Sequence, residues 1–203
     1  MKIFRDRQAV GKLLAKRLRH LSSDRGTIVL GIPRGGVVVA AEIAKELKVP
    51  LDIIVTRKIS APNQPELALG AVDSDGEIVG ELGELGGEIV KNEVEEIKRR
   101  EKTYRQDRKP LDVFGKTVIL VDDGIATGAT TLAAIRFLLR HGAKKIILAV
   151  PVASKEAKDK IIKELGEFGE IVVLETPEYF QAVGQFYHQF EPVSDEEVIQ
   201  YLK

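Results

Sequence analysis

The chain has 203 residues, of which 44% are hydrophobic and 31% charged, a composition typical of one folded domain with a sizeable core. The formal net charge is zero and no apolar run reaches the ~18–20 residues that span a bilayer, so neither nucleic acid nor a membrane is an expected partner. Without cysteine there is no disulfide or thiolate metal site, and the opening MKIFRDRQ lacks the apolar core of a signal peptide, so we expect a cytoplasmic protein.

The chain alternates helical patterns with short apolar runs rich in β-branched residues. The runs predict strands over Thr27–Ile32, Leu51–Thr56, Thr117–Val121, Lys145–Val150 and Ile171–Leu174. Helices are predicted after an N-cap at Asp6, over Val37–Leu47, Thr130–Arg140 and Ser154–Leu165, and from a capping box at Ser194. This alternation predicts an α/β fold, a doubly wound and mainly parallel five-stranded sheet in the order 2-1-3-4-5.

We expect a single domain over residues 1–203. Its core covers about 27–175, an insertion covers about 60–110, and a small C-terminal hood or tail, rich in aromatic residues, covers 176–203. Within the insertion, Leu67–Val79 predicts a hairpin turning at Asp75-Gly76, and Glu88–Gln106 predicts a charged surface helix.

Two glycine-rich loops follow the first and third predicted strands. GIPRGG covers Gly31–Gly36, and DDGIATGATT begins at Asp122. The predicted topology reverses between these strands, and ligands of such sheets bind at that crevice. Neither loop matches GxGxxG or GxxxxGK[ST], so dinucleotide and Walker-type sites have no motif support.

The second loop has the features of a phosphate site. Its side chains are mostly small, it leads into a helix N-terminus, and Thr127, Thr130 and Thr131 add hydroxyl donors. Asp122 and Asp123 could accept hydrogen bonds from vicinal hydroxyls or help to hold a phosphate-bound Mg²⁺. Together these groups suit a ribose 5-phosphate. The alternative is purely structural, a tight turn with an aspartate that caps a helix.

Basic residues are predicted at the same edge of the sheet. Arg34 lies in the first loop, and Arg57-Lys58 follows the second predicted strand. Three cations at one crevice suggest a second, more highly charged anion such as pyrophosphate.

VILVDDGIATGATT, from Val118 to Thr131, resembles the 5-phosphoribosyl 1-diphosphate signature of type I phosphoribosyltransferases. IPRGG resembles that family's pyrophosphate loop, in which a non-proline cis peptide is often found, and Arg57-Lys58 resembles the basic pair that opens its mobile loop. These motifs cover the core from Thr27 to about Val150. The combination FRDR…LGIPRGG…TRK…PELALGAV resembles a subgroup of predicted phosphoribosyltransferases whose acceptor is unassigned.

The resemblance implies a Mg²⁺-dependent transfer of a 5-phosphoribosyl group to a small nitrogenous acceptor, with release of pyrophosphate. Asp122 and Asp123 would hold the ribose hydroxyls and, mostly through ligand or water, the Mg²⁺; with Arg34 and Lys58 they form the implied catalytic set. Arg34, Gly35, Gly36, Arg57 and Lys58 would bind the diphosphate. The implied cradle for the 5-phosphate consists of Gly124, Ile125, Ala126, Thr127, Gly128, Ala129, Thr130 and Thr131.

The resemblance also suggests a lid and an acceptor contact. The segment Ser60–Glu66 would be the lid, the alternative being an ordinary surface loop. Phe180 is the first candidate to stack on the acceptor and Tyr187 the second, the alternative being a hydrophobic plug.

This sequence departs from the better-known branches of the family. The 6-oxopurine enzymes carry an aspartate at the position of Ala126, and ISAPNQPE lacks the lysines of the orotate enzymes. Two other functions stay open. One is a non-catalytic sensor of the sugar diphosphate or a nucleotide; the other is a phosphate-ester hydrolase, for which no nucleophile is evident. A homo-oligomer is compatible with the sequence.

Overall fold

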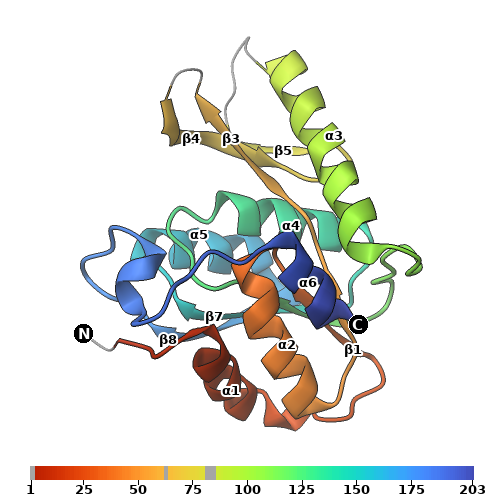
Figure 1. Cartoon of the computed structure of the whole chain (residues 1–203), viewed down its shortest axis with the longest axis vertical. Helices are drawn as coiled ribbons and strands as arrows, with labels where there is room; N and C mark the ends of the chain where they lie inside the picture. The colour runs from red at the N-terminus through yellow and green to blue at the C-terminus, as the bar shows by residue number, and fades with distance from the viewer. Residues whose placement is uncertain (1–2, 62–63, 81–85) are drawn as a thin grey trace.

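The structure is a computed structural model that describes residues 3–61, 64–80 and 86–203. Its centre is a parallel five-stranded sheet in the order β2-β1-β6-β7-β8 (Figure 1). The strands are β1 (Thr27–Gly31), β2 (Leu51–Ile53), β6 (Thr117–Val121), β7 (Lys145–Val152) and β8 (Gly169–Glu175). The predicted α/β class and strand order are confirmed.

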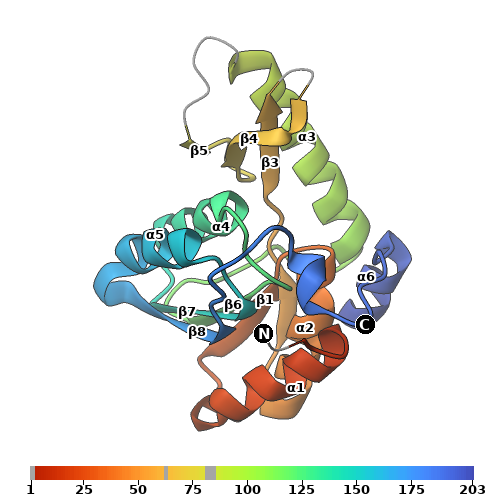
Figure 2. The ribbon, with the colours of Figure 1, turned by 90° about the vertical axis from the view of Figure 1, so that its left-hand side faces the viewer.

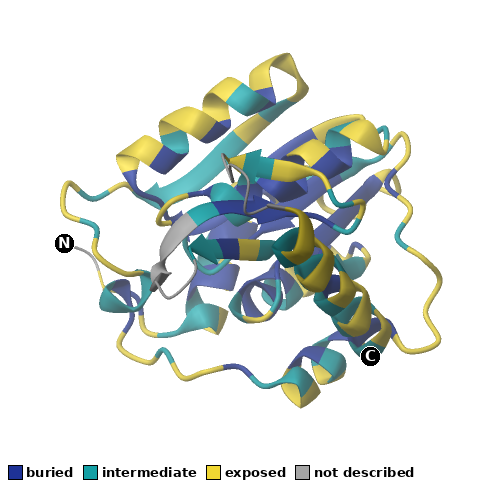
Figure 3. Ribbon diagram, turned by 90° about the horizontal axis from the view of Figure 1, so that it is seen from above, coloured by how far each residue is buried: buried dark blue, intermediate teal, exposed yellow. Residues whose placement is uncertain are grey.

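Two pairs of helices cover the two faces of this sheet (Figures 1 and 2). They are α1 (Arg7–Arg17) and α2 (Gly35–Leu47) on one face, and α4 (Ala129–Arg140) and α5 (Lys155–Leu165) on the other. Along β6, Ile119 packs with α1 and α2, while Leu120 packs with α4 and α5. Because both faces are covered, the inner strands β1, β6 and β7 are mostly buried, whereas the edge strands β2 and β8 are mostly half-buried. Exposed residues gather on the outer sides of the helices (Figure 3).

Polar side chains mark where several helices begin. Asp6 caps α1 and Ser154 caps α5, while Ser194 and Glu197 form a capping box at the start of α6 (Asp195–Leu202). Short 3-10 turns cover Arg19–Leu21, Gly166–Phe168 and Val183–Phe186. Among the helices of the described residues, none is long and apolar enough to cross a membrane.

A second, antiparallel sheet projects from the main body beside a long helix (Figure 2). It contains β3 (Arg57–Ala61), β4 (Gln64–Val72) and β5 (Ile78–Gly80), and the helix is α3 (Gly86–Arg105). Buried side chains of β3 and α3, including Ile59 and Ile97, join Val38 of α2 and Val198 of α6 in one cluster. The predicted hairpin is the β4–β5 connection, and the predicted charged helix is α3.

The chain after β2 differs from the prediction. The apolar pattern predicts a strand as far as Thr56, but β2 ends at Ile53, and Arg57-Lys58 begins β3 of the second sheet. The predicted lid falls on the two antiparallel strands β3 and β4: Ser60 lies in β3 and residues 64–66 lie in β4, whereas residues 62–63 lie outside the described residues. The reason is the antiparallel pairing of β3 with β4, a contact between segments that a single apolar run does not reveal.

Arg140, the last residue of α4, ties this second sheet to the main body. Its Nη2 donates to Oδ2 of Asp73 over 2.6 Å and to Asp75 over 3.2 Å. Asp73 is buried, and its Oδ1 accepts the backbone N–H groups of Asp75 and Glu77, which shapes the β4–β5 turn. His141 adds a contact of 2.9 Å to Asp75.

We expect Arg140→Met to lower the free energy of unfolding by about 1–2 kcal/mol, because it leaves the buried Asp73 carboxylate without its cation. Arg136→Met is the matched control: Arg136 lies on the same helix and pairs with Glu164 at the surface, a contact worth ~0–1 kcal/mol. Urea denaturation of both variants measures the difference. Equal losses would show that the Arg140 contact is no stronger than a surface ion pair.

Candidate active site

The two glycine-rich loops lie side by side where β1 and β6 end. Gly31 of β1 pairs with Val121 of β6, and the N–H of Ile32 donates to the Val121 carbonyl oxygen over 2.9 Å. The sheet order reverses between these two strands, since β2 lies outside β1 and β7 lies outside β6. The crevice at this reversal is where ligands of such sheets bind.

Gly35 and Gly36 approach the acidic pair with their backbone. A Cβ at Gly35 would overlap Oδ2 of Asp123 and lie 2.7 Å from its Cγ, and one at Gly36 would lie 2.9 Å from Cα of Asp122. A side chain at either glycine would therefore push the first loop away from the carboxylates. The structure brings together four residues that the sequence predicted for one site.

Burial of the acidic pair changes its protonation. Burial raises the pKa of the Asp122 carboxyl well above its usual range, and the charge of neighbouring Asp123 raises it further. Burial also raises the pKa of Asp123, while the guanidinium of Arg7 opposes that shift. Oδ1 of Asp122 accepts the backbone N–H of Asp123 over 2.8 Å, so the two residues hold one another in place.

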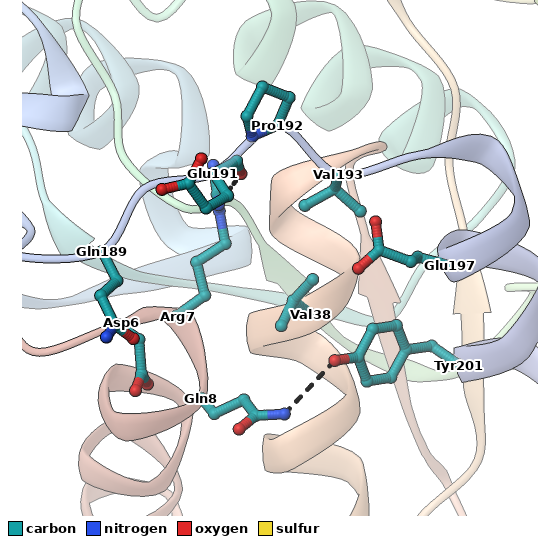
Figure 4. A pocket seen from close by; sticks show the side chains of 10 residues that line it. All are labelled: Asp6, Arg7, Gln8, Val38, Gln189, Glu191, Pro192, Val193, Glu197 and Tyr201. Atoms are coloured by element: carbon teal, nitrogen blue, oxygen red, sulfur yellow. Dashed lines mark hydrogen bonds between the residues drawn. The ribbon is translucent and has the colours of Figure 1, made fainter.

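Arg7, in the first turn of α1, enters the site although no motif assigned it a role. Its Nε donates to Oδ2 of Asp123 over 2.8 Å. Its Nη1 donates to the carbonyl oxygen of Glu191 over 2.8 Å (Figure 4). The Arg7 guanidinium lies 3.9 Å from the ring centre of Phe190. The one sequence signal for Arg7 was its place in the FRDR stretch, which carried no chemistry by itself.

The predicted phosphate cradle is anchored at one side. The hydroxyl of Ser154 donates to the carbonyl oxygen of Ala126 over 2.6 Å, which ties the loop to the end of β7. Gly128 has a left-handed φ of 82° and offers no side-chain cap to α4. The first N–H groups of α4 have no carbonyl partner within the helix, and such groups suit an anion. Thr127 is exposed, whereas Thr131 is buried.

The start of β3 lies against this cradle. The hydroxyl of Thr56 donates to the carbonyl oxygen of Thr130 over 3.2 Å. The next residue, Arg57, pairs through Nε with Glu93 of α3 at 2.6 Å, and Lys58 is exposed. Arg57 and Lys58 therefore lie beside the crevice as part of the second sheet rather than at the end of β2.

Arg34 stands at the other side of the crevice. The peptide bond between Pro33 and Arg34 is cis, as the resemblance implied. Nη1 of Arg34 lies 3.5 Å from Oδ1 of Asp195, which also accepts the hydroxyl of Tyr104 over 2.7 Å. Burial and this hydrogen bond raise the pKa of Tyr104 to about 12. The side chain of Arg34 is thus directed toward α6.

The two candidate stacking residues occupy different places. Phe180 lines a hollow of about 660 Å³ together with Ala126 of the cradle. Tyr187 is buried, its ring centre 6.0 Å from that of Phe4 and 5.0 Å from that of Phe190. Its hydroxyl donates to the backbone carbonyl oxygen of Asp123 over 2.6 Å. Tyr187 thus packs among aromatic side chains and supports the Asp123 backbone, while its contact with an acceptor stays a prediction.

The acidic pair offers a small donor set for a metal ion. Within the described part of the chain, no group of three or more His, Asp or Glu side chains could hold one. Asp122 and Asp123 supply two adjacent carboxylates, and Asp123 already binds Arg7. This set fits a Mg²⁺ that takes its remaining oxygen ligands from bound phosphates and water.

The family model of the phosphoribosyl transferase domain matches residues 3–190. The chain belongs to the phosphoribosyl transferase family. The resemblance seen in the sequence is thereby confirmed.

Three similar proteins show how far the likeness extends. The chain is 42% identical to the Mycobacterium tuberculosis protein named "Putative phosphoribosyl transferase Rv0571c", over 100% of this chain but only 47% of that protein. It is 33% identical to "Bifunctional protein PyrR" of Microcystis aeruginosa, over 72% of this chain and 68% of that protein. The crystal structure of TT1426 from Thermus thermophilus is 40% identical, with a TM-score of 0.79 and coverage of 100% of this chain and 98% of that one.

We expect Gly35→Ala to lower the free energy of unfolding by about 1–3 kcal/mol, the usual cost of overpacking. The added methyl group would meet the Asp123 carboxylate and, at 2.8 Å, Nε of Arg7. Gly87→Ala is the control, since nothing lies within 4 Å of a Cβ there and alanine suits a helix better than glycine. Chemical denaturation compares them, and equal stability would contradict the close approach of the loops.

Proposed function

We propose that the protein transfers a 5-phosphoribosyl group from 5-phosphoribosyl 1-diphosphate to a nitrogenous base or amine and releases pyrophosphate. The observation that carries this proposal is the contact of Gly35 and Gly36 with Asp122 and Asp123, beside a small-residue loop that opens α4. Membership of the phosphoribosyl transferase family supports the class of reaction. The composition supports a cytoplasmic location and no nucleic-acid or membrane partner.

The sugar phosphate would lie along the second loop. The N–H groups of Gly124–Thr131 and the hydroxyls of Thr127 and Thr130 would bind the 5-phosphate, where the helix dipole also favours an anion. Asp122 and Asp123 would accept hydrogen bonds from the ribose hydroxyls, since each carboxylate keeps lone pairs beyond those used within the protein. The ribose would then present C1 toward the first loop.

The diphosphate would lie against the first loop and the start of β3. Gly35 and Gly36 allow close approach of the backbone, and Arg34, Arg57 and Lys58 supply positive charge. Arg34 and Arg57 each pair with one carboxylate, but a guanidinium has five N–H donors, so both can still bind phosphate oxygens. Mg²⁺, held by Asp122 and Asp123 mostly through ligand or water, would neutralise charge on the departing pyrophosphate.

The reaction balances as a displacement at C1. The lone pair of the acceptor nitrogen forms the new C1–N bond, while the C1–O bond breaks and its electron pair leaves with the pyrophosphate. The proton of the acceptor nitrogen passes to solvent. Positive charge on C1 and negative charge on the leaving group both grow in the transition state, so preset cations such as Arg34 and Lys58 contribute most there.

The acceptor would occupy the hollow that Phe180 and Ala126 line. An aromatic ring favours a flat nitrogen heterocycle by stacking. Alanine at position 126 cannot exchange a proton with the acceptor, unlike the aspartate of the 6-oxopurine enzymes. The proposed acceptor is therefore a base or amine outside ordinary 6-oxopurine salvage.

The direct test is calorimetric binding of 5-phosphoribosyl 1-diphosphate with Mg²⁺, followed by a pyrophosphate-release screen of nitrogenous acceptors. We expect the Asp122→Asn, Asp123→Asn double variant to stay folded and to bind the diphosphate at least about tenfold more weakly, since it removes two charged hydrogen-bond acceptors. Unchanged affinity in that variant would place the sugar elsewhere. Tight binding by the wild type without pyrophosphate release for any acceptor would favour the non-catalytic sensor.

For the best acceptor from that screen, we expect Phe180→Ala to raise the acceptor KM by about 5–150-fold, which corresponds to ~1–3 kcal/mol of base stacking. Phe168→Ala is the control, because Phe168 is an exposed aromatic just after α5 and does not line the hollow. Steady-state kinetics with saturating sugar diphosphate measure both variants. If Phe180→Ala leaves the acceptor KM unchanged, Phe180 does not stack on the acceptor and only packs against the protein.

A further inference from the structure

Arg7 and Asp123 form an ion pair with little exposure to solvent. The exposed fractions of their side chains are 11% and 15%, whereas most ion pairs in the structure include a far more exposed partner. Low exposure makes the geometry of such a pair matter, since water cannot readily replace either partner. The pair joins the first turn of α1 to the end of β6, two segments 116 positions apart in the chain.

Arg7 is itself fixed from the outside. Its Nη1 donates to the carbonyl oxygen of Glu191 over 2.8 Å (Figure 4). Its guanidinium lies 3.9 Å from the ring centre of Phe190. A planar guanidinium that donates in two directions has one preferred orientation, unlike a lysine ammonium. The N–H at Nε therefore approaches Asp123 from a set direction.

The carboxylate of Asp123 is confined on more than one side. Arg7 occupies one lone pair of Oδ2, and the backbone of Gly35 leaves no room for even a methyl group beside the same oxygen. The hydroxyl of Tyr187 holds the Asp123 backbone carbonyl over 2.6 Å. The lone pairs that remain on the carboxylate are thus presented in a fixed direction to whatever enters the crevice.

We propose that Arg7 is a positioning residue for sugar recognition, which orients the Asp123 carboxylate so that it accepts hydrogen bonds from the ribose hydroxyls. Arg7 acts through Asp123 and does not touch the sugar. The N-terminal segment is then part of the sugar site rather than only a cover for the sheet. This inference rests on the proposed function, since it assumes that a ribose lies at the acidic pair.

The experiment measures preference for the ribose hydroxyls rather than affinity alone. Calorimetry gives the dissociation constants of ribose 5-phosphate, 2-deoxyribose 5-phosphate and 3-deoxyribose 5-phosphate for each protein. We expect Arg7→Gln to reduce the preference for ribose over at least one deoxy sugar by about tenfold, as for other directly coupled residues. Removal of a merely structural contact would instead weaken all three sugars by the same factor, and that result would overturn the inference.

Two further variants make the comparison specific. Arg5 lies in the same segment, but its Nε pairs with Asp6 rather than with Asp123. Arg5→Gln should therefore keep the wild-type preference for ribose over the deoxy sugars. In an Asp123→Asn background, Arg7→Gln should cause no further loss of preference, because its route to the sugar is already broken. Should Arg7→Gln fail to fold, Arg7→Lys replaces it, and full wild-type preference in the lysine variant would overturn the inference.

Failure of the inference is distinguishable from failure of the proposed function. If the wild-type protein binds ribose 5-phosphate with no preference over either deoxy sugar, the acidic pair does not bind the ribose hydroxyls, and both the proposed sugar site and the inference are wrong. If the wild-type protein prefers ribose and Arg7→Gln keeps that preference in full, only the proposed role of Arg7 is wrong.

Discussion

The close approach of two backbones at the ends of β1 and β6 is the constraint on which this site depends. Gly35 and Gly36 lie directly against Asp122 and Asp123, so neither glycine can carry a side chain without moving the carboxylates. The approach follows from the parallel pairing of β1 with β6, which ends with Gly31 opposite Val121. The proposed phosphate loop and the two carboxylates therefore lie next to each other at the crevice where ligands of such sheets bind.

Burial of two adjacent carboxylates is costly, and the fold offsets that cost with contacts from distant parts of the chain. Burial raises the pKa of both groups, and the Arg7 guanidinium opposes the shift at Asp123. Tyr187 supports the backbone at the same residue. The segments near Phe4 and Phe190 therefore serve the site as well as the core, since they pack around Tyr187.

Helix α4 links two parts of the proposed chemistry. Its first turn faces the predicted phosphate cradle, and its last residue, Arg140, binds the β4–β5 turn through Asp73. The strand β3, which carries Arg57 and Lys58, pairs with β4, and the preceding residue Thr56 contacts the first turn of α4. Helix α4 thus contacts the second sheet, which carries Arg57 and Lys58, at both of its ends, and the cradle leads into its first turn.

Local patterns in the sequence are enough to predict the strands of the central sheet, most of the helices and the two loops, because apolar runs, helix caps and small residues at strand ends mark them. The sequence also singled out Asp122 and Asp123, whose neighbours along the chain reveal their chemistry. The folded structure was needed to show that Arg7 binds Asp123, that the Tyr187 hydroxyl contacts the Asp123 backbone and that Arg57 belongs to the second sheet. Those contacts join residues far apart in the chain, and their geometry depends on how whole helices and strands pack, which no local pattern encodes.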